Sequence, residues 1–150
     1  MSGGSYGGYM TLAALAFDPG TWACGVDIVG ISNLRTFIAN TGAWRRNLRA
    51  AEYGDPDKDG AAMDAASPIH RVADIRAPLM VIQGANDPRV PQSEADQMVA
   101  ALRTRGVTVD YLLYPDEGHG LAKLPNRITA YTKMADFFSE HLKPAVSATP

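Results

Sequence analysis

The chain contains three short apolar runs that are rich in strand-favouring residues and that end near Gly, Pro or Asp. They lie at residues 23–29, 78–83 and 108–114. Apolar residues at helical spacing predict helices before, between and after these strands. The expected helices cover residues 9–17, 34–39, 44–53, 91–103 and 125–142. Because strands and helices alternate, we expect an α/β fold of three layers, in which a mostly parallel sheet lies between helices.

A length of 150 residues fits a single domain with one hydrophobic core. We expect the domain to cover residues 1–143 and residues 144–150 to form a flexible tail. Polar and turn-forming residues at 54–60 predict a surface loop. In open parallel sheets, functional residues gather at the carboxyl ends of the strands, so the chemistry is expected there.

Composition and charge exclude several classes of protein. Apolar residues make up 46% of the chain and charged residues 20%, as in ordinary globular proteins. The net charge of −2 offers no surface for nucleic acid, and the basic stretch at residues 45–49 is too short to supply one. The most apolar stretch, residues 9–17, is far shorter than the roughly 20 residues that span a bilayer. Since no signal peptide is visible, we expect a cytoplasmic location and no membrane contact.

The single cysteine and two of the three histidines are expected to be structural. Cys24 lies inside an apolar run, where a small buried thiol is the simplest interpretation. His70 does not follow a strand, and His141 falls in the last turn of a predicted helix, where a cation complements the helix dipole. The spacing of these residues fits no metal site, and we expect neither a metal nor a cofactor.

Residues 3–7 read Gly-Gly-Ser-Tyr-Gly and match the G-x-S-x-G pattern. Its glycines permit a tight turn that exposes the serine hydroxyl at the start of a helix. Alone the match is weak, because glycine-rich stretches also form linkers. A predicted helix follows at once, however, and an acid and a histidine come later in the order that this turn requires. Ser5 is therefore the candidate nucleophile.

The candidate acid and the candidate base each come directly after a predicted strand. Asp87 follows the apolar run at 78–83, although an aspartate before Pro88 also forms turns. His119 is flanked by glycines, which leave its imidazole free to reach a neighbouring loop. In the predicted mechanism, His119 removes the proton of Ser5 and Asp87 stabilises the imidazolium that results.

An oxyanion hole would complete such a site. One donor is expected to be the backbone N–H of Tyr6, the residue after the nucleophile, because unpaired amides at a helix start favour negative charge. The second donor should come from a loop upstream of the turn, outside these residues.

Three segments of the chain occur together in one enzyme family. The segments GGSYGGY, GANDPRVP and DEGHG, which contain Ser5, Asp87 and His119, resemble the prolyl oligopeptidase family of serine peptidases. Within it they are most similar to the acylaminoacyl-peptidase and dipeptidyl-peptidase branches. The resemblance implies the C-terminal part of an α/β-hydrolase domain that cleaves short peptides. It also implies an upstream hydrolase segment and a β-propeller as partners of this chain.

By the same resemblance, an apolar pocket for the residue before the scissile bond would be formed by Ile31, Leu34, Phe37 and Val90. Ordinary core packing at helical spacing explains these four residues equally well. The residues that distinguish an exopeptidase from an endopeptidase would lie upstream.

Two hypotheses stay open. In the first, the chain is a serine peptidase or esterase that works through an acyl-enzyme. In the second, it is a truncated, non-catalytic α/β-hydrolase fragment, because the oxyanion loop and the strand leading into Ser5 would be missing. Without that strand, residues 23–29 would form an exposed apolar edge, and we expect such an edge to recruit a second copy as a homo-oligomer.

Overall fold

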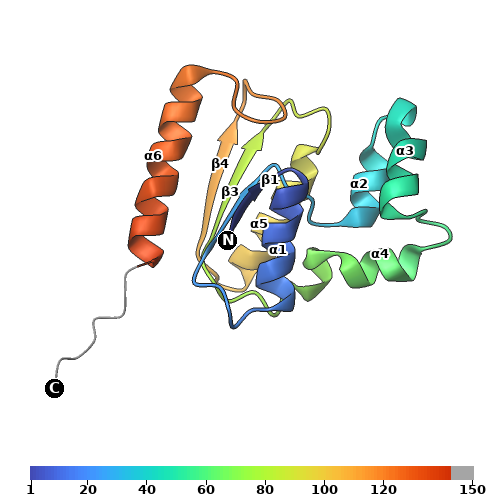
Figure 1. The fold of residues 1–150 in the computed structure, drawn as a ribbon, viewed down its shortest axis with the longest axis horizontal. Helices are drawn as coiled ribbons and strands as arrows, with labels where there is room; N and C mark the ends of the chain where they lie inside the picture. The colour runs from blue at the N-terminus through green and yellow to red at the C-terminus, as the bar shows by residue number, and fades with distance from the viewer. Residues whose placement is uncertain (143–150) are drawn as a thin grey trace.

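The computed structural model describes residues 1–142, with a four-stranded parallel sheet at the centre (Figure 1). The strands are β1 (Ser2–Gly4), β2 (Gly25–Ile28), β3 (Leu79–Gly84) and β4 (Val109–Tyr114). The helices are α1 (Tyr6–Phe17), α2 (Leu34–Asn40), α3 (Ala43–Tyr53), α4 (Gly60–Ala66), α5 (Gln92–Thr104), α6 (Leu124–His141) and the 3₁₀ helix η1 (Pro68–Arg71). The strand order is β1-β2-β3-β4, and every neighbouring pair is parallel. The parallel α/β fold predicted from the sequence is confirmed.

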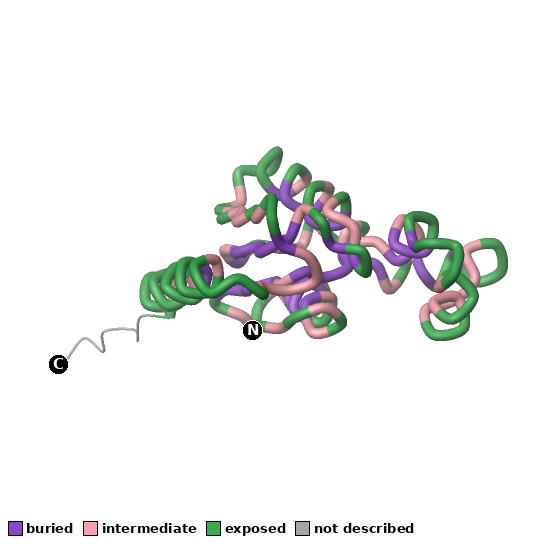
Figure 2. Tube along the Cα trace, turned by 90° about the horizontal axis from the view of Figure 1, so that it is seen from above, coloured by how far each residue is buried: buried purple, intermediate pink, exposed green. Residues whose placement is uncertain are grey.

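Helices cover both faces of the sheet, which gives the three layers expected. Side chains of β3 alternate between the faces: Leu79 and Val81 pack with α1 and α5, whereas Met80 and Ile82 pack with α6. Figure 1 shows α6 on one side of the sheet and α1 with α5 on the other. Seen from above in Figure 2, the buried segments are concentrated in the sheet and on the inner sides of these helices. The sheet is therefore held between two apolar cores.

The helices α2, α3 and α4 lie beside the sheet and do not cover either face (Figure 1). They share a third apolar cluster, to which α2 contributes Phe37 and α4 contributes Met63. No residue of α3 is buried, and its Trp44 and Leu48 are 77% and 71% exposed. This part of the molecule thus has a thin core of its own next to the carboxyl ends of the strands.

The sequence-based expectation for the N-terminal end of the sheet is wrong. β1 pairs with β2, with Gly3 opposite Asp27 and Gly4 opposite Ile28, so a strand does lead into Ser5. β2 is an inner strand, and the edge at which a homo-oligomer was expected is covered. The segment Ser-Gly-Gly has little intrinsic strand preference, and backbone hydrogen bonds to β2 define it instead.

A second difference lies in the segment after α3. The loop predicted at residues 54–60 ends at Asp59, because Gly60 begins α4, a helix that the sequence did not indicate. Only Gly60 and Met63 of this alanine-rich helix are buried. With a single large apolar side chain, α4 has no periodic pattern that would reveal it.

The described residues show no sign of a membrane span or a metal centre. No helix within residues 1–142 has the length and apolar character needed to cross a bilayer. In the same range, no group of three or more His, Cys, Asp or Glu side chains is arranged to hold a metal ion. The expected tail at 144–150, and residue 143 of the expected domain, lie outside the described residues.

Candidate active site

Ser5 lies at the turn between β1 and α1, in a backbone conformation that is uncommon for residues other than glycine. Its φ is 57° and its ψ is −116°. Its backbone N–H donates to the carbonyl oxygen of Ile28 at 2.8 Å, which ties the turn to β2. A Cβ at Gly3 would lie only 2.3 Å from the carbonyl oxygen of Gly7, so the fold-back requires glycine there. This is the sharp strand-to-helix turn predicted from the motif.

Asp87 lies in the loop that follows β3, and its side chain is fully buried. One carboxylate oxygen, Oδ1, accepts hydrogen bonds from the backbone N–H groups of Arg89 at 2.8 Å and Val90 at 3.0 Å. The other oxygen, Oδ2, lies 2.8 Å from Nδ1 of His119. The backbone of its own loop therefore orients this carboxylate toward the histidine.

His119 lies in the loop after β4 and connects the other two side chains. Its Nδ1 contacts Asp87, and its Nε2 lies 2.9 Å from Oγ of Ser5. Because a carboxylate only accepts, Nδ1–H donates to Asp87, which leaves Nε2 to accept the hydroxyl proton of Ser5. The imidazole is 16% exposed, so one side of it remains open to solvent. The structure brings all three predicted residues into one hydrogen-bonded chain at the carboxyl ends of β1, β3 and β4.

The loops that carry Asp87 and His119 are in direct backbone contact. The backbone N–H of Asn86 donates to the carbonyl oxygen of Glu117 at 2.9 Å, and its side-chain amide donates to that of Pro115 at 2.7 Å. A Cβ at Gly84 would lie 2.2 Å from the carbonyl oxygen of Gly118, so only glycine fits where the loops cross. This close approach fixes the separation of the acid and the histidine.

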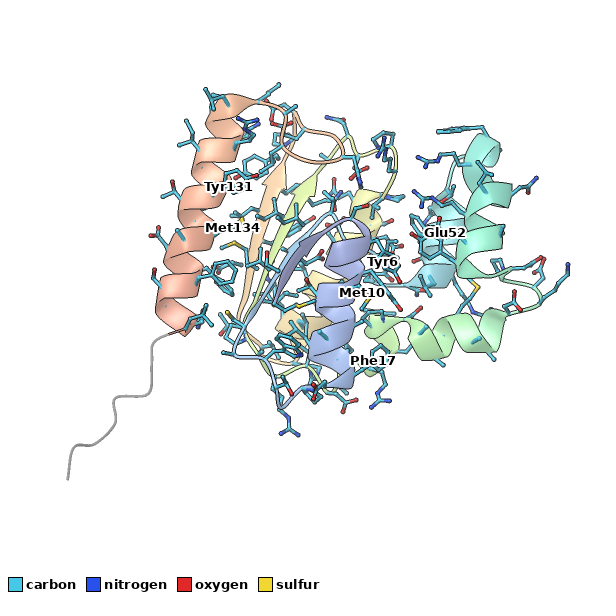
Figure 3. The ribbon with its side chains drawn as sticks, viewed as in Figure 1. Tyr6, Met10, Phe17, Glu52, Tyr131 and Met134 are labelled. Carbon is cyan, nitrogen blue, oxygen red and sulfur yellow. The ribbon has the colours of Figure 1, made fainter. Side chains whose placement is uncertain are left out.

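Tyr6 is the first residue of α1, directly after Ser5, so its backbone N–H has no acceptor from a preceding helical turn. Its use as an oxyanion donor stays a prediction. Its ring is 53% exposed and faces the α2–α3 side of the molecule in Figure 3. The ring centroid lies 5.5 Å from that of Tyr9 and 6.2 Å from that of Tyr53, which contacts Phe37 edge-on at 5.4 Å. An aromatic row thus extends from the serine turn to α2.

The four residues predicted to line a substrate pocket lie together in the third apolar cluster. The cluster contains Ile31, Leu34, Phe37 and Val90, each 5% exposed or less. Its position beside the aromatic row brings it next to the serine turn. Such burial equally fits a packed core, so contact with substrate stays a prediction. The guanidinium of Arg49 also lies over the rings of Phe37 and Tyr53, which the sequence analysis did not foresee.

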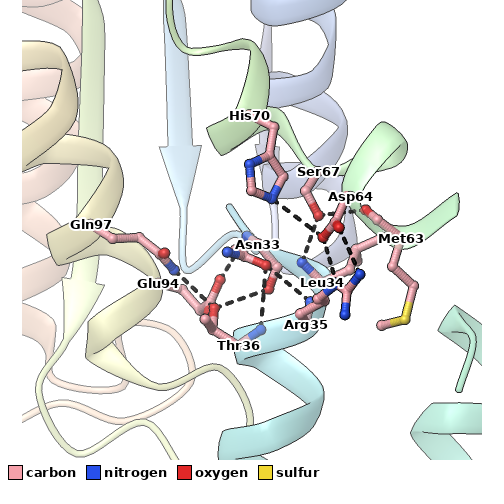
Figure 4. Close-up of polar contacts among 10 residues, drawn as sticks. All are labelled: Asn33, Leu34, Arg35, Thr36, Met63, Asp64, Ser67, His70, Glu94 and Gln97. Atoms are coloured by element: carbon pink, nitrogen blue, oxygen red, sulfur yellow. Dashed lines mark hydrogen bonds and ion pairs between the residues drawn. The ribbon is translucent and has the colours of Figure 1, made fainter. Parts of the chain in front are cut away.

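One buried carboxylate, Glu94 of α5, organises the loop between β2 and α2 (Figure 4). It accepts hydrogen bonds from the backbone N–H groups of Ser32 at 3.1 Å and Asn33 at 2.9 Å, and from the hydroxyl of Thr36. Burial raises the pKa of Glu94, although these donors lower it in part. Asn33 in turn caps α2 by accepting from the backbone N–H of Arg35. The loop carrying Ile31 is therefore fixed by a side chain from a distant helix.

The remaining candidate groups lie away from Ser5. His70 contacts Asp64, which forms a close ion pair with Arg35 (Figure 4), and His141 packs edge-on against Phe137. Cys24 is buried, and burial raises the pKa of its thiol. These positions agree with the structural roles expected for all three residues.

Asp27 of β2 is a buried carboxyl that the sequence analysis overlooked. Burial raises the pKa of Asp27 to about 7, although the backbone N–H of Gly30 lowers it in part. Its Oδ1 lies 2.3 Å from where a Cβ at Gly8 would stand, so it fills the space left by that glycine of α1. The glycine after the motif therefore serves the packing of α1 on β2.

The strand-turn-helix at Ser5 and the loops after β3 and β4 define an α/β-hydrolase fold. A sequence model described as the prolyl oligopeptidase family matches residues 1–145. The chain belongs to this family of peptidases.

Its relatives are considerably longer proteins. The chain is 44% identical over 141 residues to dipeptidyl aminopeptidase BIII of Pseudoxanthomonas mexicana, covering 91% of this chain and 20% of that protein. It is 47% identical over 146 residues to dipeptidyl peptidase family member 6 of Caenorhabditis elegans, covering 93% and 20%. The structure of Pyrococcus horikoshii acylaminoacyl peptidase is similar with a TM-score of 0.87 and 25% identity, covering 99% of this chain and 25% of that chain. The chain thus spans about a fifth of the length of these curated relatives.

Proposed function

We propose that this chain carries the reactive groups of a serine peptidase that cleaves short peptides through an acyl-enzyme. The observation that supports this proposal is the hydrogen-bonded chain from Ser5 through His119 to Asp87, with contacts of 2.9 and 2.8 Å. Such distances permit proton transfer between a nucleophile and its base without rearrangement. Membership of a peptidase family supports the same reaction class.

In the proposed reaction, Oγ of Ser5 attacks the carbonyl carbon of the scissile peptide bond while Nε2 of His119 accepts the hydroxyl proton. His119 passes that proton to the leaving amine as the carbon–nitrogen bond breaks, and an ester forms on Ser5. A water molecule, deprotonated by the same nitrogen, then attacks the ester carbon. The bond from that carbon to Oγ of Ser5 breaks, Oγ takes back the proton from His119, and the carboxylic acid is released. Asp87 holds the imidazole by Nδ1–H and stabilises its positive charge at both stages.

Negative charge on the carbonyl oxygen requires donors that are already in place. The backbone N–H of Tyr6 is the proposed donor from this chain, since it begins α1 beside Ser5. The second donor is proposed to belong to the upstream hydrolase segment of a longer protein, together with a β-propeller that restricts access. A cytoplasmic location of that protein is part of the same proposal.

The substrate pocket is proposed to lie at the cluster formed by Ile31, Leu34, Phe37 and Val90. The cluster is apolar and adjoins the aromatic row that starts at Tyr6. The cluster itself is buried, and the half-exposed ring of Tyr6 lies at the end of the aromatic row beside it. An apolar side chain of the peptide would displace water from that ring and gain affinity by burial. The names of the relatives, dipeptidyl and acylaminoacyl peptidases, support peptides as the substrate class.

Labelling with a fluorophosphonate probe tests the proposal, because the probe forms a covalent bond only with an activated serine. We expect Ser5 of the wild-type chain to be labelled and Ser5→Ala to be unlabelled. Ser2→Ala is the matched control, since Ser2 lies three residues away on β1 and should leave labelling unchanged. His119→Ala should slow labelling by at least about a hundredfold, whereas His70→Ala should not.

Two results would contradict the proposal. Labelling that persists in Ser5→Ala would show that the probe reacts elsewhere. A wild-type chain that resists the probe, while remaining folded by circular dichroism, would favour the alternative of a non-catalytic α/β-hydrolase domain.

A further inference from the structure

Glu117 is a buried acid two residues before His119, in the loop between β4 and α6. The residue is 2% exposed. Its Oε2 accepts a hydrogen bond from the backbone N–H of Ala122 at 2.9 Å. Its Oε1 accepts from the backbone N–H of Lys123 at 2.9 Å and from the side-chain amide of Asn126 at 2.8 Å. The carboxylate thereby connects the two ends of the segment 117–123, and His119 belongs to that segment.

The backbone of Glu117 connects the same loop to the loop of Asp87. Its carbonyl oxygen accepts from the backbone N–H of Asn86, the residue before Asp87, at 2.9 Å. The main chain of Glu117 is thus fixed to the acid's loop, and its side chain is fixed to the start of α6. His119 lies between these attachments, two residues after Glu117 and three residues before Ala122, the first backbone N–H that the carboxylate accepts.

The Glu117 carboxylate is held in its charged form by the groups around it. Hydrogen bonds from the Asn126 side chain and from the backbone N–H groups of Ala122 and Lys123 hold the pKa of Glu117 below its ordinary value, against a smaller opposing effect of burial. The carboxylate is therefore ionised at neutral pH. Hydrogen bonds to an ionised acceptor are stronger than those between neutral groups, and a negative charge at the start of a helix is favourable.

We propose that Glu117 is a positioning residue that fixes the loop of residues 117–123 and so holds Nε2 of His119 within reach of Ser5. The proposal rests on the function proposed above, in which that nitrogen accepts the proton of Ser5. Gly120 has a φ of 109°, a backbone conformation that residues other than glycine rarely adopt, and it allows the loop to bend directly after His119. Without the carboxylate, the backbone N–H groups of Ala122 and Lys123 lose their acceptor. The loop then keeps its backbone contact to Asn86, the packing of Leu121 and the half-exposed side-chain contacts of Asp116, and the imidazole gains freedom to move.

The neighbouring acid, Asp116, offers a matched control. It also contacts Asn126, at 3.1 Å, and Lys123, at 2.6 Å, but it contacts their side chains only. Its side chain is 48% exposed. Glu117→Gln and Asp116→Asn therefore remove the same charge from adjacent residues, and only the first replaces an oxygen that accepts a loop amide, since Oε1 and Oε2 of Glu117 each accept one.

The first measurement uses nuclear magnetic resonance. It detects the Nδ1 proton of His119, which is donated to Asp87. This signal does not depend on turnover. We expect a distinct low-field resonance in the wild type and in Asp116→Asn. It should broaden or vanish in Glu117→Gln, whose amide NH₂ cannot accept from a backbone N–H. An unchanged resonance in Glu117→Gln would overturn the proposal.

The second measurement is the rate of fluorophosphonate labelling at Ser5. We expect Glu117→Gln to lower it about tenfold to a hundredfold, as misplacement of a catalytic group by a fraction of an ångström does, and Asp116→Asn to leave it unchanged. Equal losses in both variants would overturn the proposal, because they would show a general effect of charge.

The two measurements separate this proposal from the proposed function. A wild-type chain that is not labelled, but whose His119 resonance is lost in Glu117→Gln, would refute the function and support the positioning role. If Glu117→Gln does not fold, Glu117→Asp replaces it. That variant keeps the charge but is one methylene too short to reach both amides, and the same losses are expected.

Discussion

Two loops at the carboxyl ends of the strands are each held by one buried glutamate, and the two glutamates differ in which parts of the chain they connect. Glu117 holds the loop that contains His119, and Glu94 holds the loop between β2 and α2. Both carboxylates accept two backbone N–H groups. The donors to the Glu117 carboxylate lie within nine residues of it, whereas the Glu94 carboxylate accepts from residues about sixty positions away in the sequence. Glu117 therefore stabilises its own loop, whereas Glu94 connects α5 to α2 and to the loop before it.

The difference is also electrostatic. Its donors hold the pKa of Glu117 below the ordinary value, while burial raises the pKa of Glu94 above it. Burial of the Glu94 carboxyl between α5 and α2 thus outweighs its hydrogen bonds from Thr36, from Asn33 and from the backbone N–H and hydroxyl of Ser32. The two buried carboxylates therefore differ in surroundings: that of Glu117 is held by hydrogen bonds in the charged form, and that of Glu94 is desolvated by packing.

The largest effect is expected from Asp87→Asn, which changes the chemistry and little else. The asparagine Oδ1 still accepts from the N–H groups of Arg89 and Val90, so the loop should keep its shape. Its NH₂ would face Nδ1 of His119 and force the proton onto Nε2, the nitrogen that must accept from Ser5. We expect the labelling rate at Ser5 to fall roughly 10⁴-fold, with unfolding changed by less than about 1 kcal/mol.

Urea unfolding and probe kinetics of the same preparation measure both quantities. A variant that loses several kcal/mol of stability would break the comparison, because Asp87 would then be a structural residue of its loop.

Glu94→Ala should have the opposite effects: a large loss of unfolding free energy and a small change in the labelling rate at Ser5. It leaves the buried backbone N–H of Ser32 and the partly buried backbone N–H of Asn33 without an acceptor, and it creates a cavity beside Thr36. We expect a loss of about 3 to 5 kcal/mol in unfolding free energy. Where the variant stays folded, the labelling rate of a small probe should change by less than about tenfold, since Glu94 does not contact the Ser5–His119–Asp87 chain.

Gln97→Ala is the control for this experiment. Gln97 contributes one hydrogen bond at the edge of the same network, to the hydroxyl of Thr36 at 3.1 Å, and should lose less than about 1.5 kcal/mol (Figure 4). Equal losses in the two variants would show that Glu94 is not the residue on which the loop depends.

The three residues of the hydrogen-bonded chain could be placed from the sequence because each is marked locally. Ser5 lies in a motif of five residues, and Asp87 and His119 each follow an apolar run that ends in a turn. The parallel sheet then brings strand ends together, whatever the distance between them in sequence. This reasoning placed the acid and the histidine without any knowledge of their contacts.

The supporting residues could not be predicted in this way. Glu94 is an acid in the first turn of α5, and nothing near it in the sequence indicates that it accepts hydrogen bonds from the amides of residues 32 and 33. β1 was missed for a related reason, because its pairing with β2 depends on main-chain atoms and not on the side chains of Ser2, Gly3 and Gly4. Contacts made by the backbone leave little trace in the pattern of apolar residues.

The smallest effect, and the one that separates the two glutamates most directly, is expected in the pH dependence of stability. Burial raises the pKa of Glu94 above the ordinary 4.5, so the folded chain keeps a proton that the unfolded chain releases as the pH rises through that value. The stability of the wild type relative to Glu94→Gln should therefore fall as the pH increases above 4.5.

For Glu117 the sign is reversed. Because its donors hold the pKa below 4.5, its contribution is fully present above that value and is lost as the pH falls through the folded-state pKa. Urea unfolding of the wild type, Glu94→Gln and Glu117→Gln at a series of pH values measures both differences, and subtraction removes the titration of groups common to all three chains, such as Asp27. Two differences with the same slope would mean that both carboxylates lie in equivalent surroundings. We expect the difference in unfolding free energy to fall with pH above 4.5 for Glu94→Gln and to rise with pH below 4.5 for Glu117→Gln.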